Sequence, residues 1–114
     1  MLSKPHRIPS SELSTVMRFG KRMQMDTLSL IYARNAISAV RFTFVVSTKI
    51  DKRATRRNRM RRLMSESVRL HLHVITPGCD AVFVAKKGLA GLSQTEVEAQ
   101  VVGALGKAGI LNHE

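Results

Sequence analysis

The sequence predicts an α+β fold in which helices pack on a small sheet, in the order α-β-β-α-β-α. Three observations lead to this prediction. Three stretches have apolar residues at helical spacing, three short segments are rich in β-branched and aromatic residues, and a capping motif opens the last helix. The chain has 114 residues, of which 44% are hydrophobic, so we expect residues 1–114 to form a single domain with one core.

The first helix should follow a basic arm of nine residues that contains two prolines. Ser10 or Ser11 can cap its N-terminus. Three apolar residues then share one face at helical spacing: Leu13, Val16 and Met17. Gly20 should end the helix.

Two strands should follow as an antiparallel pair, over residues 28–33 and 41–47. Both segments are short and rich in β-branched and aromatic residues, and a loop that contains Asn35 separates them. A third strand is expected over residues 80–85, directly after a turn at Pro77 and Gly78.

The longest periodic stretch lies between the second and third strands and predicts an amphipathic helix of about five turns. Its apolar stripe has i, i+3 and i+4 spacing and consists of Met60, Leu63, Met64, Val68, Leu72 and Ile75. We expect this helix to begin between Ala54 and Arg56, with Thr55 as a cap.

The last helix should begin at a capping box, Ser93-Gln94-Thr95-Glu96. In this motif the serine hydroxyl and the glutamate carboxylate each accept a hydrogen bond from the backbone N–H of the other residue. Apolar residues then recur at helical spacing from Val97 to Ala108, and Gly109 should end the helix.

The chain is strongly basic: 19 Lys and Arg residues stand against 8 Asp and Glu residues, and the formal net charge is +11. Such an excess indicates a polyanion as the partner, and nucleic acid in particular. Eight of the basic residues fall between Lys49 and Arg62, where Asp51 is the only acidic residue. Like charges at i, i+3 and i+4 repel each other in an isolated helix, so we expect phosphates to neutralise this surface.

Arginine dominates this segment, which favours RNA without excluding DNA. The planar guanidinium can bind a phosphate through two hydrogen bonds and can stack on an unpaired base. Asn58, between two arginines, adds a neutral donor and acceptor for a base edge or a 2′-hydroxyl. The alternative interpretation, that the arginines are only the solvated face of a core helix, suits an ordinary charge run better than a run of nearly one sign.

Composition also disfavours several classes of protein. No apolar run is long enough to cross a membrane, and residues 1–10 lack the apolar core of a signal peptide. We therefore expect a cytoplasmic protein without a membrane partner. The lone cysteine, Cys79, cannot form an internal disulfide and has no Cys or His at metal-ligand spacing around it.

The sequence predicts no catalytic centre and no metal, cofactor or small-molecule site in the protein itself. The histidines are His6, His71, His73 and His113; His71 and His73 fall on different sides of the periodic helix, so they cannot share a metal as an i, i+4 pair would. No cluster of carboxylates suits the two metal ions of phosphodiester hydrolysis. The carboxylates are Glu12, Asp26, Asp51, Glu66, Asp80, Glu96, Glu98 and Glu114.

Residues 53–63, Arg-Ala-Thr-Arg-Arg-Asn-Arg-Met-Arg-Arg-Leu, resemble the signature helix of the protein subunit of bacterial ribonuclease P, whose hallmark is Arg-Asn-Arg. The surrounding segments agree: residues 44–49 resemble the strand before the signature, and residues 80–88 resemble the strand after it. Leu92-Ser93 and Gly20-Lys21-Arg22 also match. The resemblance therefore covers nearly the whole chain in the right order.

The resemblance implies a fold like that of a ribosomal-protein domain, with a left-handed β-α-β crossover around the Arg-Asn-Arg helix, whereas the general rule predicts a right-handed one. In this family the RNA subunit removes the 5′ leader of precursor tRNA, using magnesium that the RNA binds. The protein subunit binds RNase P RNA and holds the leader in a cleft between the first helix and the sheet. The chain would then be the non-catalytic subunit of a tRNA-processing ribonucleoprotein endonuclease.

Two sets of residues follow from the resemblance. The predicted RNA contacts are Arg57, Asn58 and Arg59 of the signature, with Lys49, Arg53, Arg56, Arg61, Arg62, Lys86 and Lys87 around them. The predicted leader-cleft residues are Leu13, Met17, Tyr32, Phe42 and Phe44. Phe42 and Phe44 should share one face of their strand, where a plain core role suits them equally well.

This chain departs from the family pattern at four positions. Leu13 and Met17 stand where aromatic residues are usual, Thr48 where Lys is usual, and Ser65 where Arg is usual. Without the two aromatics, apolar packing and electrostatics rather than base stacking would hold the leader.

Two other functions fit part of the sequence. A ribosomal or ribosome-assembly protein shares the size, the basicity and the type of fold, but the Arg-Asn-Arg helix between two matching strands counts against it. A DNA-binding regulator would need a helix-turn-helix pair, whereas strands flank the signature helix.

Overall fold

The computed structural model describes residue 2 and residues 4–111 of the chain. Three α-helices surround a four-stranded sheet, in the order α-β-β-β-α-β-α. The helices are α1 (Ser10–Phe19), α2 (Ala54–Arg69) and α3 (Gln94–Ala108), and the strands are β1 (Lys21–Gln24), β2 (Leu28–Arg34), β3 (Val40–Val45) and β4 (Cys79–Ala85). Short 3-10 turns lie at η1 (Lys4–His6), η2 (Leu72–Val74) and η3 (Lys87–Leu89).

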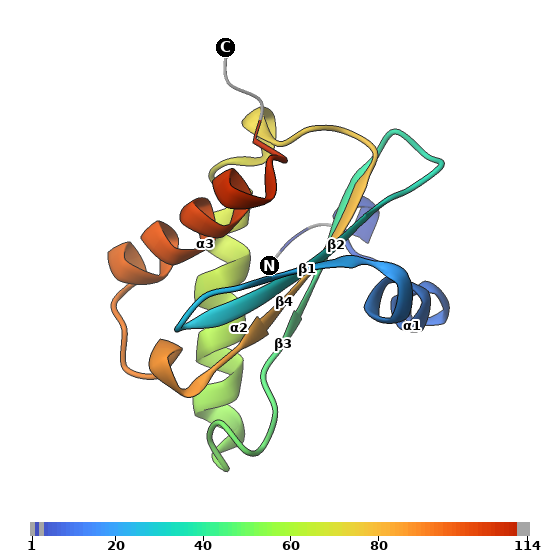
Figure 1. Cartoon of the computed structure of the whole chain (residues 1–114). Coiled ribbons are helices and arrows are strands. Elements are labelled where there is room, and N and C mark those ends of the chain that lie inside the picture. The colour runs from blue at the N-terminus through green and yellow to red at the C-terminus, as the bar shows by residue number, and fades with distance from the viewer. Residues whose placement is uncertain (1, 3, 112–114) are drawn as a thin grey trace.

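The sheet separates two layers of helix. Its strand order is β1-β2-β4-β3, with β3 and β4 parallel and the other neighbours antiparallel. Helices α2 and α3 lie against one face, and α1 packs on the other (Figure 1). An α+β fold with helices on a small sheet is therefore confirmed.

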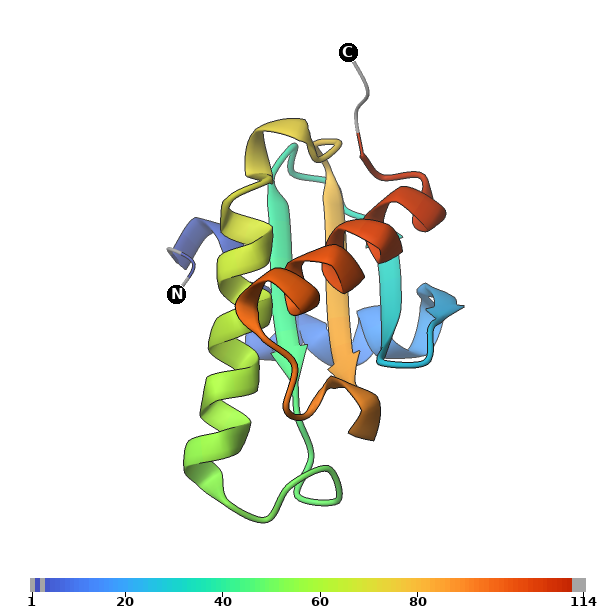
Figure 2. The ribbon, with the colours of Figure 1, turned by 90° about the vertical axis from the view of Figure 1, so that its left-hand side faces the viewer.

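The connection from β3 through α2 to β4 is left-handed. Figure 2 views the sheet from the side of α2 and α3, with β3 and β4 both running downward and β4 to the right of β3. Turned so that both strands point upward, β4 lies to the left of β3, which is the hand opposite to that of nearly all such connections. The crossover implied by the family resemblance is present.

Most of the core lies between the sheet and the pair α2 and α3. Leu28 and Leu30 of β2 and Met64 and Val68 of α2 are fully buried there. Three phenylalanine rings stack along the same face, with centroids 5.8 to 6.3 Å apart: Phe42, Phe44 and Phe83. A smaller cluster under α1 contains Ile8, Val16, Ile31 and Val82.

Several element boundaries follow the sequence predictions. The capping box forms: Ser93 Oγ accepts from the Glu96 backbone N–H (3.2 Å), and the Glu96 carboxylate accepts from the Ser93 N–H (3.0 Å). Gly109 ends α3 in the left-handed region, at φ 75°, where glycine is favoured.

Other predicted boundaries are wrong. The sequence order lacks β1, a short exposed strand of polar and basic residues. The predicted antiparallel pair of residues 28–33 and 41–47 is also wrong, because β4 lies between β2 and β3 and pairs with both. The long amphipathic stretch is split, because α2 ends at Arg69 and a separate 3-10 turn carries Leu72. Neither predicted serine or threonine cap forms: Pro9 precedes α1 and Arg53 precedes α2, both without a side-chain cap.

Candidate nucleic-acid interface

Helix α2 has a buried inner side and a charged outer side. Met60, Met64 and Val68 recur every four residues and pack against β3 and α3, so they fix the rotation of the helix. Arg56, Asn58, Arg59 and Arg62 are exposed, while Arg57 and Arg61 are half-buried. Lys49, Lys52 and Arg53 are exposed in the loop that leads into the helix. These nine side chains, together with Asp51 between them, are called the α2 basic surface below.

Asp51 holds the loop at the start of α2. Its carboxylate accepts from the backbone N–H of Arg53 (2.9 Å) and pairs with the Arg53 guanidinium (3.2 Å). The hydrogen bond from the Arg53 backbone, together with that side chain, lowers the pKa of Asp51 below its ordinary value. The one acid of the basic surface is thus already used inside the protein.

Arg57 has an internal role that sequence periodicity does not indicate. Its guanidinium donates to the carbonyl oxygens of Asp51 (3.0 Å) and Lys52 (2.8 Å). The first turn of α2 is thereby tied to the preceding loop. Since Arg57 has further N–H groups, it can still donate to a phosphate at the helix start.

Asn58 and Arg61 are coupled one turn apart on the outer side of α2. The Arg61 guanidinium donates to Asn58 Oδ1. The amide of Asn58 therefore orients the charge of Arg61 as well as offering its own N–H groups to a ligand.

The loop after β4 lies beside the start of α2. A hollow of about 320 Å³ separates Arg56 and Arg59 from Ala90 and Gly91, which follow η3. Figure 2 places η3 and the first turns of α2 at the same end of the molecule. Of the two predicted lysines there, Lys87 is exposed, whereas Lys86 is half-buried and donates to the Met25 carbonyl (2.6 Å).

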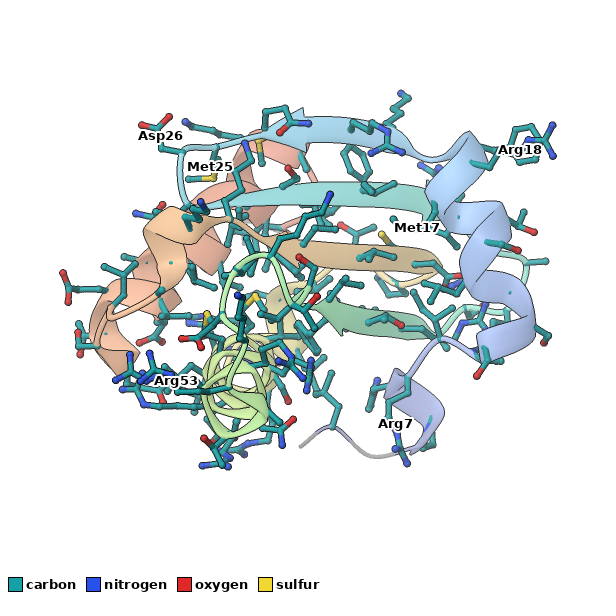
Figure 3. The ribbon with its side chains drawn as sticks, turned by 90° about the horizontal axis from the view of Figure 1, so that it is seen from below. Arg7, Met17, Arg18, Met25, Asp26 and Arg53 are labelled. Atoms are coloured by element: carbon teal, nitrogen blue, oxygen red, sulfur yellow. The ribbon has the colours of Figure 1, made fainter. Side chains whose placement is uncertain are left out.

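Ser65, where the family pattern has Arg, is buried with 1% exposure. In the part of the chain that the structure describes, its hydroxyl has no hydrogen-bond partner. It lines a hollow of about 170 Å³ together with Arg61 and with Arg7 of the N-terminal arm. The arm therefore supplies a cation beside α2, on the lower right of Figure 3. Sequence reasoning missed Arg7, because only the pairing of the arm with β3 brings it there.

The five predicted leader-cleft residues do not lie on one face of the sheet. Leu13 and Met17 of α1 are half-buried against the cluster of Ile31 and Val82. Tyr32, Phe42 and Phe44 point to the opposite face, toward α2 and α3. Phe42 and Phe44 share a face of β3 as predicted, and at 1% exposure Phe42 has the core role that was the other interpretation.

The strand residues that share a face with Leu13 and Met17 occupy alternate positions of the strands, so their side chains point to the α1 side of the sheet. Ala33 of β2, Val45 of β3 and Val84 of β4 are half-buried and pack on the same cluster. Their facing follows from the two-residue period of a strand once the register is known. We call Leu13, Met17, Ala33, Val45 and Val84 the α1-side face.

An ion network centred on buried Arg41 and Asp80 holds α1 on this face. The Arg41 guanidinium donates to both oxygens of Asp80 (2.8 and 2.7 Å) and to the carboxylate of Glu12 on α1 (3.0 and 3.3 Å). The hydrogen bonds that Arg41 donates to Asp80 and then to Glu12 raise the pKa of Arg41, so the group stays charged although it is buried. Asn35 also donates to Asp80 (2.7 Å).

The remaining titratable groups suggest no second chemistry. His71, in the turn after α2, hydrogen-bonds Glu98 of α3 (2.8 Å), and burial raises the pKa of the Cys79 thiol to about 11. Among residues 2 and 4–111, no three His, Cys, Asp or Glu side chains lie together as metal ligands. His113 and Glu114 lie outside the described residues. Within the same range, no helix is long and apolar enough to span a membrane.

The sequence profile of the family described as Ribonuclease P matches residues 2–109. The chain belongs to the Ribonuclease P family. A Ribonuclease P protein component from Clostridium botulinum (strain Loch Maree) is 35% identical over 104 residues, which cover 90% of this chain and 93% of the relative.

Solved structures of RNase P proteins have the same fold as this chain. A Staphylococcus aureus RNase P protein mutant superimposes with a TM-score of 0.88 at 19% identity, over 95% of this chain and 92% of the other. The RNase P protein from Thermotoga maritima gives a TM-score of 0.81 at 24% identity, over 89% and 96%. At these identities the structures establish the fold, and the sequence relatives establish the family.

Proposed function

We propose that this chain is the protein subunit of ribonuclease P, which binds RNase P RNA through the α2 basic surface and assists removal of the 5′ leader of precursor tRNA. The observation that carries the proposal is the charge of that surface. Eight cations gather at the start of α2, and their single acid, Asp51, is bonded to Arg53. A ligand must supply the missing negative charge, and a phosphate backbone does so.

In this proposal the leader lies on the α1-side face. Its apolar residues are half-buried and remain accessible, and the Arg41 network fixes the position of α1 beside them. Leu13 and Met17 offer flexible aliphatic surface rather than aromatic rings, so contacts to riboses and bases there are apolar and tolerant of sequence.

The chemistry belongs to the RNA in this proposal. The donors of the α2 basic surface are guanidinium and ammonium groups, which bind phosphates and repel Mg²⁺, so the magnesium ions that cleave the substrate are held by the RNA subunit. The protein lowers the magnesium that the reaction needs, because its cations screen the repulsion between two RNAs. A cytoplasmic location follows from this partnership.

Reconstitution with RNase P RNA tests the proposal. At low magnesium, the chain should raise cleavage of precursor tRNA above that of the RNA alone, and the chain without RNA should not cleave. The double variant Arg59→Ala, Arg62→Ala should remove most of the gain, since both side chains are exposed on the basic surface.

The matched control is Arg69→Ala, which removes the same charge from the same helix. Arg69 pairs with Glu66 at the other end of α2, so this variant should act as wild type. Cleavage by the RNA-free protein, no gain over the RNA alone, or equal loss in both variants would each contradict the proposal.

A further inference from the structure

A third hollow lies at the end of the molecule opposite the α2 basic surface. Its volume is about 430 Å³, and it is lined by the ends of α1, β2 and α3, the start of β1 and the loop before β4. Strands β3 and β4 are parallel, so the start of β4 and the loop that follows β3 are at opposite ends of the sheet. Figure 3 accordingly shows Arg18, the neighbour of the lining residue Phe19, on the opposite side of the molecule from Arg53 of the basic surface.

Two cations flank an aromatic ring on the floor of the hollow. Lys21 of β1 is the direct cross-strand partner of Tyr32, and Arg34 lies two residues further along β2 on the same side. Tyr32 is half-buried, whereas Lys21 and Arg34 are exposed. The residues that line the hollow include no carboxylate.

The end of α3 and the loop before β4 both border the hollow. The helix closes at Gly109, and Thr76 to Cys79 form the far wall. A volume of this size lies within the range of small-ligand pockets, about 300–1,000 Å³, and admits a nucleoside.

Phe19 stands at the rim, on the last residue of α1. It is 73% exposed, the highest value among the large hydrophobic residues that the structure describes. The guanidinium of Arg18 lies 5.3 Å from the centre of its ring. An exposed ring and a half-buried ring, with cations beside both, is the combination that binds single-stranded nucleic acid: bases stack on the rings and phosphates meet the cations.

We propose that this hollow is a second RNA-binding site, which takes one unpaired nucleotide with its base against Phe19 and Tyr32 and its phosphates beside Lys21 and Arg34. The proposal rests on the proposed function in taking RNA as the partner. It adds a contact that the α2 basic surface cannot make, because the two sites lie at opposite ends of the folded molecule. One protein could then hold two separate stretches of RNA.

The single tyrosine of the chain makes the site directly observable. Tyr32 is the only Tyr and the chain has no Trp, so its ring protons are resolved in an aromatic NMR spectrum of the full-length protein. A single-stranded RNA pentamer of adenosines should shift these resonances through the ring current of the stacked base. Phe19→Ala should weaken the affinity measured by this titration by roughly 5- to 150-fold, the range expected for one base stacked on one aromatic ring.

Two further variants separate this site from other effects. Ile37→Ala removes an apolar side chain that is also exposed (50%) but lies outside the hollow, and it should titrate as wild type. Arg59→Ala with Arg62→Ala should weaken binding of RNase P RNA and leave the Tyr32 shifts intact. If the wild-type chain shows the Tyr32 shifts but does not bind RNase P RNA, the proposed function falls and the nucleotide site stands.

Three outcomes would overturn the inference. The Tyr32 resonances could stay unmoved at saturating pentamer, Phe19→Ala could titrate as wild type does, or inorganic phosphate alone could reproduce the shifts. The last result would make the hollow an anion patch without base recognition.

Discussion

Arg41 and the arginines of α2 carry the same charge in opposite settings. Arg41 is 7% exposed and has Asp80 and Glu12 as partners within the fold. The α2 basic surface is open to solvent, and its eight cations share one carboxylate. An arginine whose charge is balanced internally serves the fold, whereas one whose charge is left unbalanced is available to a ligand.

The largest effect is expected from breaking the balanced site. Arg41→Ala leaves Asp80 buried beside Asn35 without its cation, which costs about 3 kcal/mol or more and lowers the melting temperature by roughly 10 °C. Thermal unfolding followed by circular dichroism measures this change.

The control for Arg41 is a variant that removes both charges. Arg41→Met with Asp80→Asn should recover a large part of the lost stability, because no unpaired ion remains buried. If Arg41→Ala melts within a degree or two of wild type, the network does not hold α1 and the contrast with α2 fails.

A smaller difference should separate two neighbours on α2. Arg57→Ala removes the hydrogen bonds to the Asp51 and Lys52 carbonyls and should cost about 1 kcal/mol, while Arg59→Ala should stay within about 0.5 kcal/mol. Both should lose affinity for RNase P RNA. Urea unfolding and RNA binding, measured on the same samples, compare the two variants. Equal unfolding midpoints for Arg57→Ala and Arg59→Ala would show that Arg57 has no structural role.

Salt dependence sharpens the contrast further. If roughly six cations of the α2 basic surface meet phosphate, log affinity for RNase P RNA should fall with log salt at a slope on the order of −4 to −5. Arg61→Ala should make the slope shallower by about one unit, and Asn58→Ala should lower affinity with little change in slope.

The hydrogen bond between these two residues adds an expectation about the double variant. Because Asn58 orients Arg61, each single variant removes part of the same interaction with RNA. The double variant should therefore lose less affinity than the sum of the two single losses. Potassium chloride titrations of all four proteins measure both quantities. Identical slopes would place Arg61 on a merely solvated surface.

The smallest effect concerns the one acid of the basic surface. The folded chain lowers the pKa of Asp51 below its ordinary value of 3.8, so its stabilising bonds are fully present above that pH and are lost as the pH falls through the lower, folded value. Wild type should therefore lose slightly more melting temperature than Asp51→Asn between about pH 4 and pH 2. Parallel pH curves would show that Asp51 does not hold the loop.

Local patterns in the sequence were enough to predict the elements with strong periodicity. The stripe of Met60, Met64 and Val68 predicted the inner side of α2, and the capping box predicted the start of α3. β1 was missed because Lys-Arg-Met-Gln has neither apolar alternation nor β-branched residues; its pairing with β2 forms it.

The parts of the candidate site that depend on register were beyond sequence reasoning. A shift of one residue moves a strand side chain to the opposite face, and nothing local indicates whether Phe42 or Arg41 faces α1. The left-handed crossover runs against the general rule and came only from the family resemblance. The bonds of Arg57 to the loop depend on a backbone path that no periodicity encodes.

The two edges of the sheet also determine whether copies of the chain can pair strand to strand. β3, with Val40, Phe42 and Phe44, would be a ready template for intermolecular strand pairing, but the N-terminal arm bridges it: Ile8 donates its N–H to the Phe42 carbonyl (3.1 Å), and the His6 ring nitrogen donates to that of Val40 (2.9 Å). At the other edge, β1 is only four residues long and begins with Lys21 and Arg22, whose charges repel a second copy. One edge of the sheet is thus covered by the arm and the other is short and charged, so neither is a ready template for strand pairing between copies.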